Sequence, residues 1–469
     1  MRTLLLSTML CLSMSCSSTS EEKIDDTAAS TRTRTSTTPT NSTDACADVE
    51  GLSTAPGEHQ VLQRVLNIST NIDTHVWATC EHTGDPTEVH LVESTSLSSS
   101  HELSVTGLAP ATEYMCDVHT ACREGASKGI GFVTDALPTD VSTFSATGMS
   151  DNSWGSYNLF TDGYVCGDYD SANTHLLITD AEGTPRWFYD VPEALASSDV
   201  DLRYLGDEGI HVAGGWGSFD VYAPHLGIFR TLSTTNDVRI KRTKPSIGIA
   251  FNHHSERLND GTYVSLTYAL HELDPDYMVG TQVEIWDPTT DRVTWEWSSE
   301  HAISEGRLDP YTTGTTEIAT WASNSVSFVD DVLGPAMYLS VVTTNEIWRV
   351  DRETKQITHI IGIGSDFTLL DADGETLPPS KWFYFQHDPE ITEDGRILLH
   401  DNGQGRPGPR HSRVVEFQID FEAMTLTQLW EWTEPDWHNL YLGDADRLPN
   451  GNVLIATGYF WCLSGINGN

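Results

Sequence analysis

Short alternations of apolar and polar residues fill most of this chain of 469 residues. Asx-Gly pairs separate the apolar runs, as at Asp260-Gly261, Asp394-Gly395 and Asn450-Gly451. Both positions of such a pair accept a positive φ, which a tight hairpin requires. No stretch has a helical period of convincing length. The pattern therefore predicts an all-β protein.

One pattern recurs from about residue 140 onward. It consists of an apolar strand, a DG or NG turn, a second strand, an Asp-containing turn and a strand that ends in tryptophan. Its copies cover residues 157–191, 200–232, 251–297, 319–362, 382–432 and, incompletely, 442–458. Repeats of about four strands that close into a ring form a β-propeller. Residues 140–469 are therefore predicted to form a six-bladed β-propeller.

Residues 55–137 show shorter alternating strands with a different marker. The run Gly107-Leu108-Ala109-Pro110-Ala111-Thr112-Glu113-Tyr114 resembles the fibronectin type III signature. This resemblance implies a β-sandwich in which the Tyr114 hydroxyl bonds to upstream backbone. It also implies that Trp77 is the core tryptophan. The domain is expected to act as a spacer.

The first 45 residues contain two signals that precede any folded domain. Arg2 and the short apolar run from Leu4 to Leu12 read as a secretory signal over residues 1–16, because the run is too short to span a bilayer. Small residues before Cys16 resemble a lipoprotein signal, so we expect an exported chain, lipid-anchored at Cys16 in the bacterial outer membrane or periplasm. Plain secretion and a buried structural Cys16 are the alternatives. Residues 17–45, rich in Ser and Thr, are expected to be a disordered tether.

Charge and cysteine content narrow the possible partners. A net charge of −42 excludes nucleic acid and anionic membrane surfaces as bulk electrostatic partners, and an anionic substrate would need locally assembled donors. If Cys11 leaves with the signal and Cys16 is acylated, six cysteines remain, enough for up to three disulfides of open connectivity. A pair between Cys166 and Cys462 would lock the first and last blades together.

Three side chains stand at matching places in successive repeats: His254, Asn324 and His387. Equivalent strand positions of a propeller face the same end or channel, so these side chains are expected to converge. The alternative is that each is satisfied by hydrogen bonds in a turn. The chain has no P-loop, GxSxG, HExxH or dinucleotide-binding motif, and no cofactor is expected.

The surroundings of His387 resemble the arylsulfate sulfotransferase family. The resemblance rests on Gln386-His387-Asp388, on the run from Leu398 to Gly403, on Ser412-Arg413-Val414-Val415-Glu416, on Leu429-Trp430-Glu431-Trp432 and on the run from Arg447 to Asn452. It implies a periplasmic propeller that moves a sulfuryl group from an aryl sulfate to a phenolic acceptor through a sulfated histidine. By position, His387 matches the nucleophile, His254 a second active-site histidine and Asn324 the asparagine of a His-x-Asn-Ser motif.

Two departures from the family pattern bear on activity. The histidine of the His-x-Asn-Ser motif falls on Ala322, and the arginine expected on the next strand falls on or beside Val342. His254 and Asn324, with Lys381 or Arg413, would then have to supply the missing donors, although Arg413 is better suited to bracing a blade. The rival functions are a catalytically degenerate propeller that binds a ligand or protein partner, and a metal site built from His253, His254 and His387.

Overall fold

The structure is a computed structural model. It describes residues 46–57, 61–120, 128–141, 143, 157–161, 175–190, 200–204, 210–214, 228–232, 238–242, 251–272, 277–299 and 323–457. The chain divides into two compact units, residues 16–138 and residues 139–469. The described residues are almost entirely strand and turn, which confirms the all-β prediction. None of their helices is long and apolar enough to cross a membrane.

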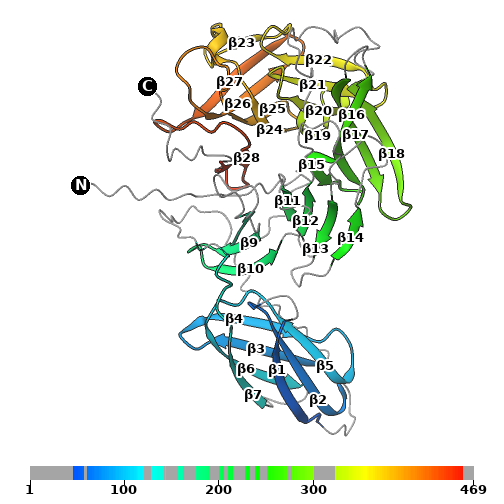
Figure 1. Cartoon of the computed structure of the whole chain (residues 1–469), viewed down its shortest axis with the longest axis vertical. Helices are drawn as coiled ribbons and strands as arrows, with labels where there is room; N and C mark the ends of the chain where they lie inside the picture. The colour runs from blue at the N-terminus through cyan, green and yellow to red at the C-terminus, as the bar shows by residue number, and fades with distance from the viewer. Residues whose placement is uncertain are drawn as a thin grey trace, which may run out of the picture. The chain divides into compact units, whose positions relative to one another are not determined.

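The N-terminal unit contains two antiparallel sheets (Figure 1), in the orders β1-β2-β5 and β4-β3-β6-β7. The strands are β1 (Val49–Pro56), β2 (Arg64–Thr74), β3 (Val76–His82), β4 (Asp85–Glu93), β5 (Ser98–Val105), β6 (Glu113–Thr120) and β7 (Lys128–Val133). Leu66 and Leu103 of the first sheet pack against Val76 and Val118 of the second in one buried cluster. β1 begins at Val49, ahead of residue 55, where the sequence placed the start of this domain.

The corner predicted around Tyr114 is present. The Ala109 N–H donates to the Tyr114 hydroxyl over 2.9 Å, and that hydroxyl donates to Glu88 Oε1 over 2.5 Å. Trp77, in contrast, is not a core residue. Side chains alternate between the faces of a strand, and the inward positions of β3 are Val76, Ala78 and Cys80. Trp77 is half-buried on the other face, where it stacks on His119. The fibronectin type III resemblance stays a prediction.

One disulfide joins neighbouring strands of this unit. Cys80 on β3 lies opposite Cys116 on β6, and both are fully buried. Cys46 is disulfide-bonded as well. Cys166 and Cys462, whose pairing was predicted, lie outside the described residues, as do Cys16 and the whole of residues 1–45.

The C-terminal unit consists of sheets that follow the predicted repeats in chain order. The described strands are β8 (Tyr157–Thr161), β9 (His175–Asp180) and β10 (Pro185–Asp190); β11 (Val200–Tyr204), β12 (Ile210–Gly214), β13 (Ile228–Leu232) and β14 (Val238–Arg242); β15 (Phe251–Arg257), β16 (Tyr263–Glu272), β17 (Tyr277–Asp287) and β18 (Arg292–Ser298). They continue with β19 (Ser323–Asp331), β20 (Gly334–Val341), β21 (Glu346–Asp351) and β22 (Ile357–Gly362); β23 (Thr368–Leu370), β24 (Gln386–Ile391), β25 (Arg396–Asp401), β26 (Arg413–Asp420) and β27 (Thr425–Trp432); and β28 (Asp444–Arg447) with β29 (Val453–Ala456).

Successive sheets contact one another through one edge strand of each sheet. β8 contacts β11, and the same holds for β11 with β15, β15 with β19, β19 with β24, and β24 with β28. This arrangement is propeller-like, while six blades and a closed ring stay predictions. The sheet of β24–β27 gains an outer strand, because β23 pairs in parallel with β27. A short 3-10 helix, Pro379–Lys381, precedes β24.

The tryptophans that end the repeats tie neighbouring sheets together. Trp295 and Trp297 of β18 donate their indole N–H groups to the carbonyls of Arg352 and Lys355, each over 3.0 Å. Both carbonyls lie in the turn between β21 and β22 of the following sheet. Trp297 is fully buried in the cluster shared by these two sheets. The recurring tryptophan is therefore a packing residue between repeats.

Candidate active site

His387 lies on β24, an edge strand of its sheet, and 8% of its surface is exposed. The backbone on either side of it is unusual. Phe385 has a φ of 54° and Asp388 a φ of 38°, values that side-chain-bearing residues seldom adopt. The register of β24 against β25 also shifts between His387 and Glu390. Such conformations cost of order 1–3 kcal/mol each and cluster at functional sites.

The hydrogen bonds of Asn402 determine which nitrogen of His387 carries the proton. Asn402 Nδ2 donates to the carbonyls of Asn439 (3.0 Å) and Leu442 (2.8 Å), so Oδ1 is the atom that faces His387 Nδ1 at 2.7 Å. Because Oδ1 can only accept, Nδ1 must carry the hydrogen. His387 Nε2 accepts the Leu442 N–H over 3.2 Å. His387 is thus held as a neutral imidazole with its lone pair on Nε2.

The structure brings the other two predicted residues to the same place. His254 on β15 is 6% exposed, and its Nδ1 lies 3.9 Å from Oδ1 of Asp388, the residue after His387. Its Nε2 lies 3.7 Å from Glu256 Oε2. Asn324 on β19 donates from Nδ2 to the carbonyl of Gln386, the residue before His387, over 2.7 Å. His254 and Asn324 therefore each contact a residue adjacent to His387.

A second buried histidine lies across from His387. His400 on β25 pairs with it in the strand register and is fully buried. Burial, and then the neighbouring His387, lower the pKa of His400 to about 3, so this ring is neutral at pH 7. Its face is closely covered, since a Cβ on Gly443 (φ 116°) would come within 2.7 Å of the ring. Trp437 packs edge-on against it with centroids 5.3 Å apart.

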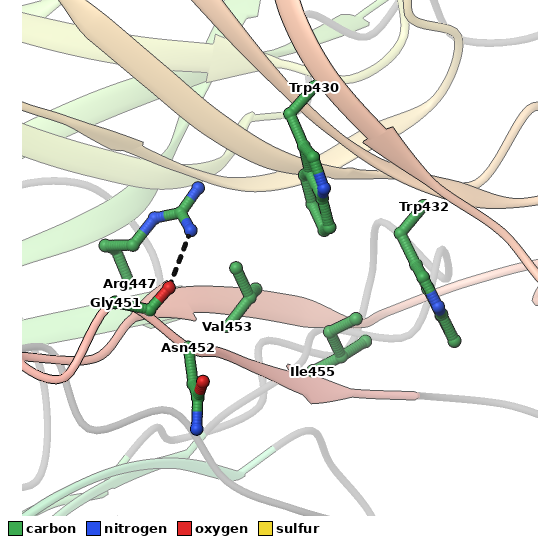
Figure 2. A pocket seen from close by; sticks show the side chains of 7 residues that line it. All are labelled: Trp430, Trp432, Arg447, Gly451, Asn452, Val453 and Ile455. Carbon is green, nitrogen blue, oxygen red and sulfur yellow. Dashed lines mark hydrogen bonds between the residues drawn. The ribbon is translucent and has the colours of Figure 1, made fainter. Parts of the chain in front are cut away.

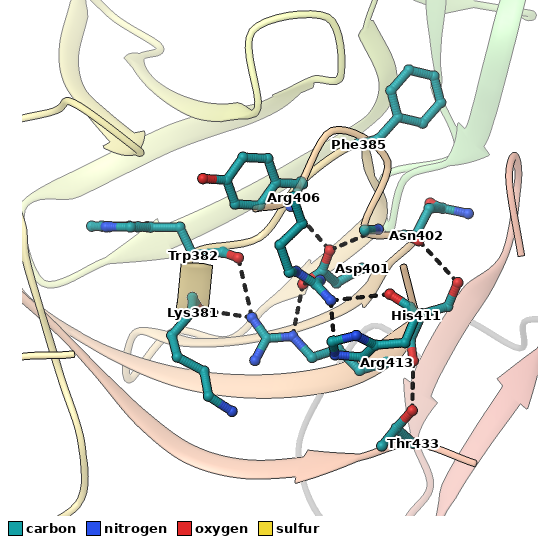
Figure 3. A network of polar contacts seen from close by, with 12 residues as sticks. Lys381, Trp382, Phe385, Asp401, Asn402, Arg406, His411, Arg413 and Thr433 are labelled. Atoms are coloured by element: carbon teal, nitrogen blue, oxygen red, sulfur yellow. Dashed lines mark hydrogen bonds and ion pairs between the residues drawn. The ribbon is translucent and has the colours of Figure 1, made fainter. Parts of the chain in front are cut away.

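Two buried cations, Arg406 and Arg413, and the partly exposed Lys381 form one network of ion pairs (Figure 3). Asp401 Oδ2 pairs with Arg406 and with Arg413 Nε at 2.8 Å. Arg413 also contacts Glu431 at 2.5 Å and the Lys381 carbonyl at 2.7 Å. Lys381 Nζ pairs with Glu431 at 3.3 Å. Lys381 and Arg413 are therefore both paired with carboxylates of this network. Arg413 has the structural role that the sequence also suggested.

Comparison with known proteins places the chain in a family. Residues 153–466 match the family described as Arylsulfotransferase (ASST). The chain belongs to the arylsulfotransferase family. The arylsulfate sulfotransferase AssT of Escherichia coli O6:H1 is 21% identical over an alignment of 428 residues, and the match covers 75% of this chain and 65% of that protein. AssT of Lelliottia amnigena is 21% identical over 429 residues, with the same shares. This chain thus spans just under two thirds of the length of these curated relatives.

Among solved structures, a protein of unknown function from Bacteroides caccae aligns with 77% of this chain and 94% of its own. The identity is 11% and the TM-score is 0.36, a value too low to show a shared fold.

The position expected to carry the family's arginine is apolar and covered. Val342, which follows β20, is 7% exposed. An arginine placed there would be buried and would need new partners. Ala322, where the family histidine is expected, lies outside the described residues, and so does the side chain of His253. Among the residues described, no group of three His, Cys, Asp or Glu side chains could hold a metal ion.

A cavity of about 410 Å³ (Figure 2) has a lining that does not include His387. Trp430 and Trp432 of β27 form one side, and Val453 and Ile455 of β29 face them across the opening. Arg447 closes one end and donates to the Gly451 carbonyl over 3.0 Å. These tryptophans hold the places that Trp295 and Trp297 hold on β18, so the cavity belongs to the contact between neighbouring sheets.

Sequence reasoning missed two contributors to this site. Asn402 lies in the run quoted for the family resemblance but received no role. Leu442 contributes only its backbone N–H and carbonyl, which its side chain does not reveal. A polar residue directly after a strand, as Asn402 follows β25, was the one available signal.

Proposed function

We propose that this chain transfers a sulfuryl group from an aryl sulfate to a phenolic acceptor, with His387 as the residue transiently sulfated. The observation that carries the proposal is the neutral imidazole of His387, whose Nε2 lone pair is kept by the hydrogen bond from Nδ1 to Asn402. A neutral imidazole is a competent nucleophile at pH 7. Membership of the arylsulfotransferase family supports this reading.

The reaction balances without a cofactor. Nε2 of His387 forms a bond to sulfur while the aryl oxygen–sulfur bond breaks and a phenolate leaves. The oxygen of the acceptor phenol then bonds to sulfur, the Nε2–sulfur bond breaks, and the acceptor's proton ends on the first phenolate. Negative charge grows on the leaving oxygen, so donors aimed at that oxygen lower the barrier. We assign this role to His254, and to Asn324 the role of holding the Gln386 carbonyl in place.

The aromatic rings beside His387 suit an aryl substrate. The Phe385 ring lies 5.8 Å from the His387 ring, centroid to centroid, and 5.6 Å from Tyr441. The Phe385 N–H donates to Asn345 Oδ1 over 2.7 Å, which holds the strained backbone that presents this ring. Tyr441 is 43% exposed. A phenyl ring that packs on such a pair gains about 0.5–1.5 kcal/mol beyond area burial.

We expect Phe385→Ala to raise the KM for an aryl sulfate by roughly tenfold, with a smaller change in kcat, because stacking binds ground state and transition state alike. Steady-state rates over a range of donor concentrations measure this. Phe385→Leu, which keeps apolar bulk without a ring face, should fall between alanine and wild type. A kcat loss with unchanged KM in Phe385→Ala would contradict a binding role.

The test of the proposed function itself is acceptor dependence. The purified full chain is mixed with p-nitrophenyl sulfate, with and without phenol, and nitrophenol release is followed. Release only when phenol is present supports transfer; release without phenol indicates a sulfatase; and no release in either case favours the binding-propeller alternative. The apolar Val342 is the observation that favours that alternative.

We also propose that the chain is exported and lipid-anchored through Cys16. The small residues before Cys16 support this, and the buried pair of Cys80 and Cys116 fits an oxidising compartment. In cells given a labelled fatty acid, wild type is expected to take up the label and Cys16→Ala is not. Equal labelling of the two would rule the anchor out.

A further inference from the structure

Asn402 is one of the buried side chains that hold the segment after β27 over His387, together with Ser412 and Asn439. Asn402 is fully buried, and its amide reaches the ring of His387 on one side and the carbonyls of Asn439 and Leu442 on the other. Leu442 has a φ of 60°, and its N–H is the group that meets His387 Nε2. Asn402 therefore fixes both the proton on Nδ1 and the donor at Nε2.

We propose that Asn402 is a positioning residue that makes Nε2 of His387 the nitrogen that is sulfated. This rests on the proposed function. When Nε2 bonds to sulfur, Nδ1 keeps its hydrogen and the ring gains positive charge. The Asn402 carbonyl oxygen, 2.7 Å from Nδ1, stabilises that charge without stabilising it as strongly as a carboxylate would. A neutral partner thus helps the ring to accept the sulfuryl group and still lets it leave.

The Leu442 N–H fits the same scheme. It occupies the Nε2 lone pair in the structure, so this bond must break before Nε2 attacks sulfur. The N–H is then left beside the group that carries the sulfuryl oxygens. A backbone donor at this place offsets part of what the missing arginine would supply, because fixed dipoles at a developing charge need no reorganisation.

Exchanging Asn402 for aspartate tests the role of the neutral partner. Asn402→Asp places a carboxylate against Nδ1, which favours the doubly protonated ring and is expected to raise the pKa of His387, typically by about 1–3 for an adjacent opposite charge. The acid limb of the pH profile of kcat/KM should move upward by about that amount. If Asn402 served only to hold the fold, Asn402→Asp would lower the stability of the protein but leave the acid limb of the pH profile where wild type has it.

Other titratable groups surround His387, and all of them are unchanged in the comparison. They are Asp388 on its own strand, His400 on β25, His254 on β15, Tyr441 in the segment over it, and Asp444 and Asp446 on the adjacent β28. The matched control is Asn439→Ala. Asn439 is equally buried and donates to the same Leu442 carbonyl over 3.0 Å, so this variant loosens the segment while leaving Asn402 in place. Its acid limb should stay where wild type has it.

The protonation of the two His387 ring nitrogens can also be measured directly, without enzyme activity and without a variant at Asn402. In the full chain labelled with 15N-histidine, the signals lost in His387→Gln identify this ring. Between pH 7 and 8 they should show a protonated Nδ1 and an unprotonated Nε2, and brief exposure to an aryl sulfate should place the sulfuryl group on Nε2. The reverse tautomer, sulfation of Nδ1, or an unmoved acid limb in a folded Asn402→Asp would overturn the proposal. A protonated Nδ1 in a chain without transferase activity would instead overturn the proposed function alone.

Discussion

His387→Ala is expected to abolish acceptor-dependent sulfuryl transfer, with a loss on the order of 10⁴-fold or more. The nucleophile forms the intermediate, and the variant has no imidazole at this position to accept the sulfuryl group. His254→Ala should leave measurable activity, since a charge-stabilising group lowers a barrier without forming the intermediate. Phenol release in the presence of an acceptor measures both variants.

Intact mass after brief mixing with an aryl sulfate gives the second readout. Wild type should gain one sulfuryl group and His387→Ala none. His359→Ala, a half-buried histidine of β22 that packs against Phe367 and Phe421, serves as the control and should keep both activity and adduct. An adduct of equal size on His387→Ala would assign the nucleophile to another residue.

Asp401→Ala is expected to destabilise the C-terminal unit by about 3–5 kcal/mol, because it leaves two buried guanidinium groups without their shared carboxylate. Arg406 and Arg413 are 3% and 1% exposed, and Asp401 is fully buried. Asp401 Oδ1 also accepts the Tyr384 N–H over 2.9 Å, directly before the strained Phe385. The loss should therefore disturb the backbone of the site as well as the core.

Urea unfolding followed by tryptophan fluorescence measures this change, because every tryptophan except Trp77 lies in residues 139–469. Asp330→Ala is the matched control. Asp330 is 72% exposed and 3.8 Å from Arg352, so its removal should cost no more than about 1 kcal/mol. Similar unfolding midpoints for the two variants would show that the Asp401 network does not hold this sheet together.

The features that the sequence predicted correctly depend on the spacing of residues along the chain or within a repeat. The Tyr114 corner depends on residues within a few positions of one another, and the convergence of His254, Asn324 and His387 depends on equivalent places in repeated strands. Trp77 was misplaced because one position along a strand changes the face, and the phase of β3 is set by Val76, Ala78 and Cys80.

The rest of the site depends on contacts that no spacing encodes. Leu442 meets His387 across 55 positions of sequence and does so with its backbone. The proton on His387 Nδ1 follows from how Asn402 is turned, and two carbonyls of another segment decide that orientation. The sequence left open a catalytic role for the charge of Arg413, because it does not reveal the four groups that bond this guanidinium in the structure.

The disulfide between Cys80 and Cys116 has a consequence for how the N-terminal unit responds to reductants. Its loop of 36 residues removes about 4 kcal/mol of chain entropy from the unfolded state in the usual entropic account. Both sulfurs lie in the core between the sheets, so a thiol cannot reach them while the sandwich is closed. Reduction must wait for the unit to open, and the rate of reduction would then report the rate of opening and change little with reductant concentration once reductant is in excess.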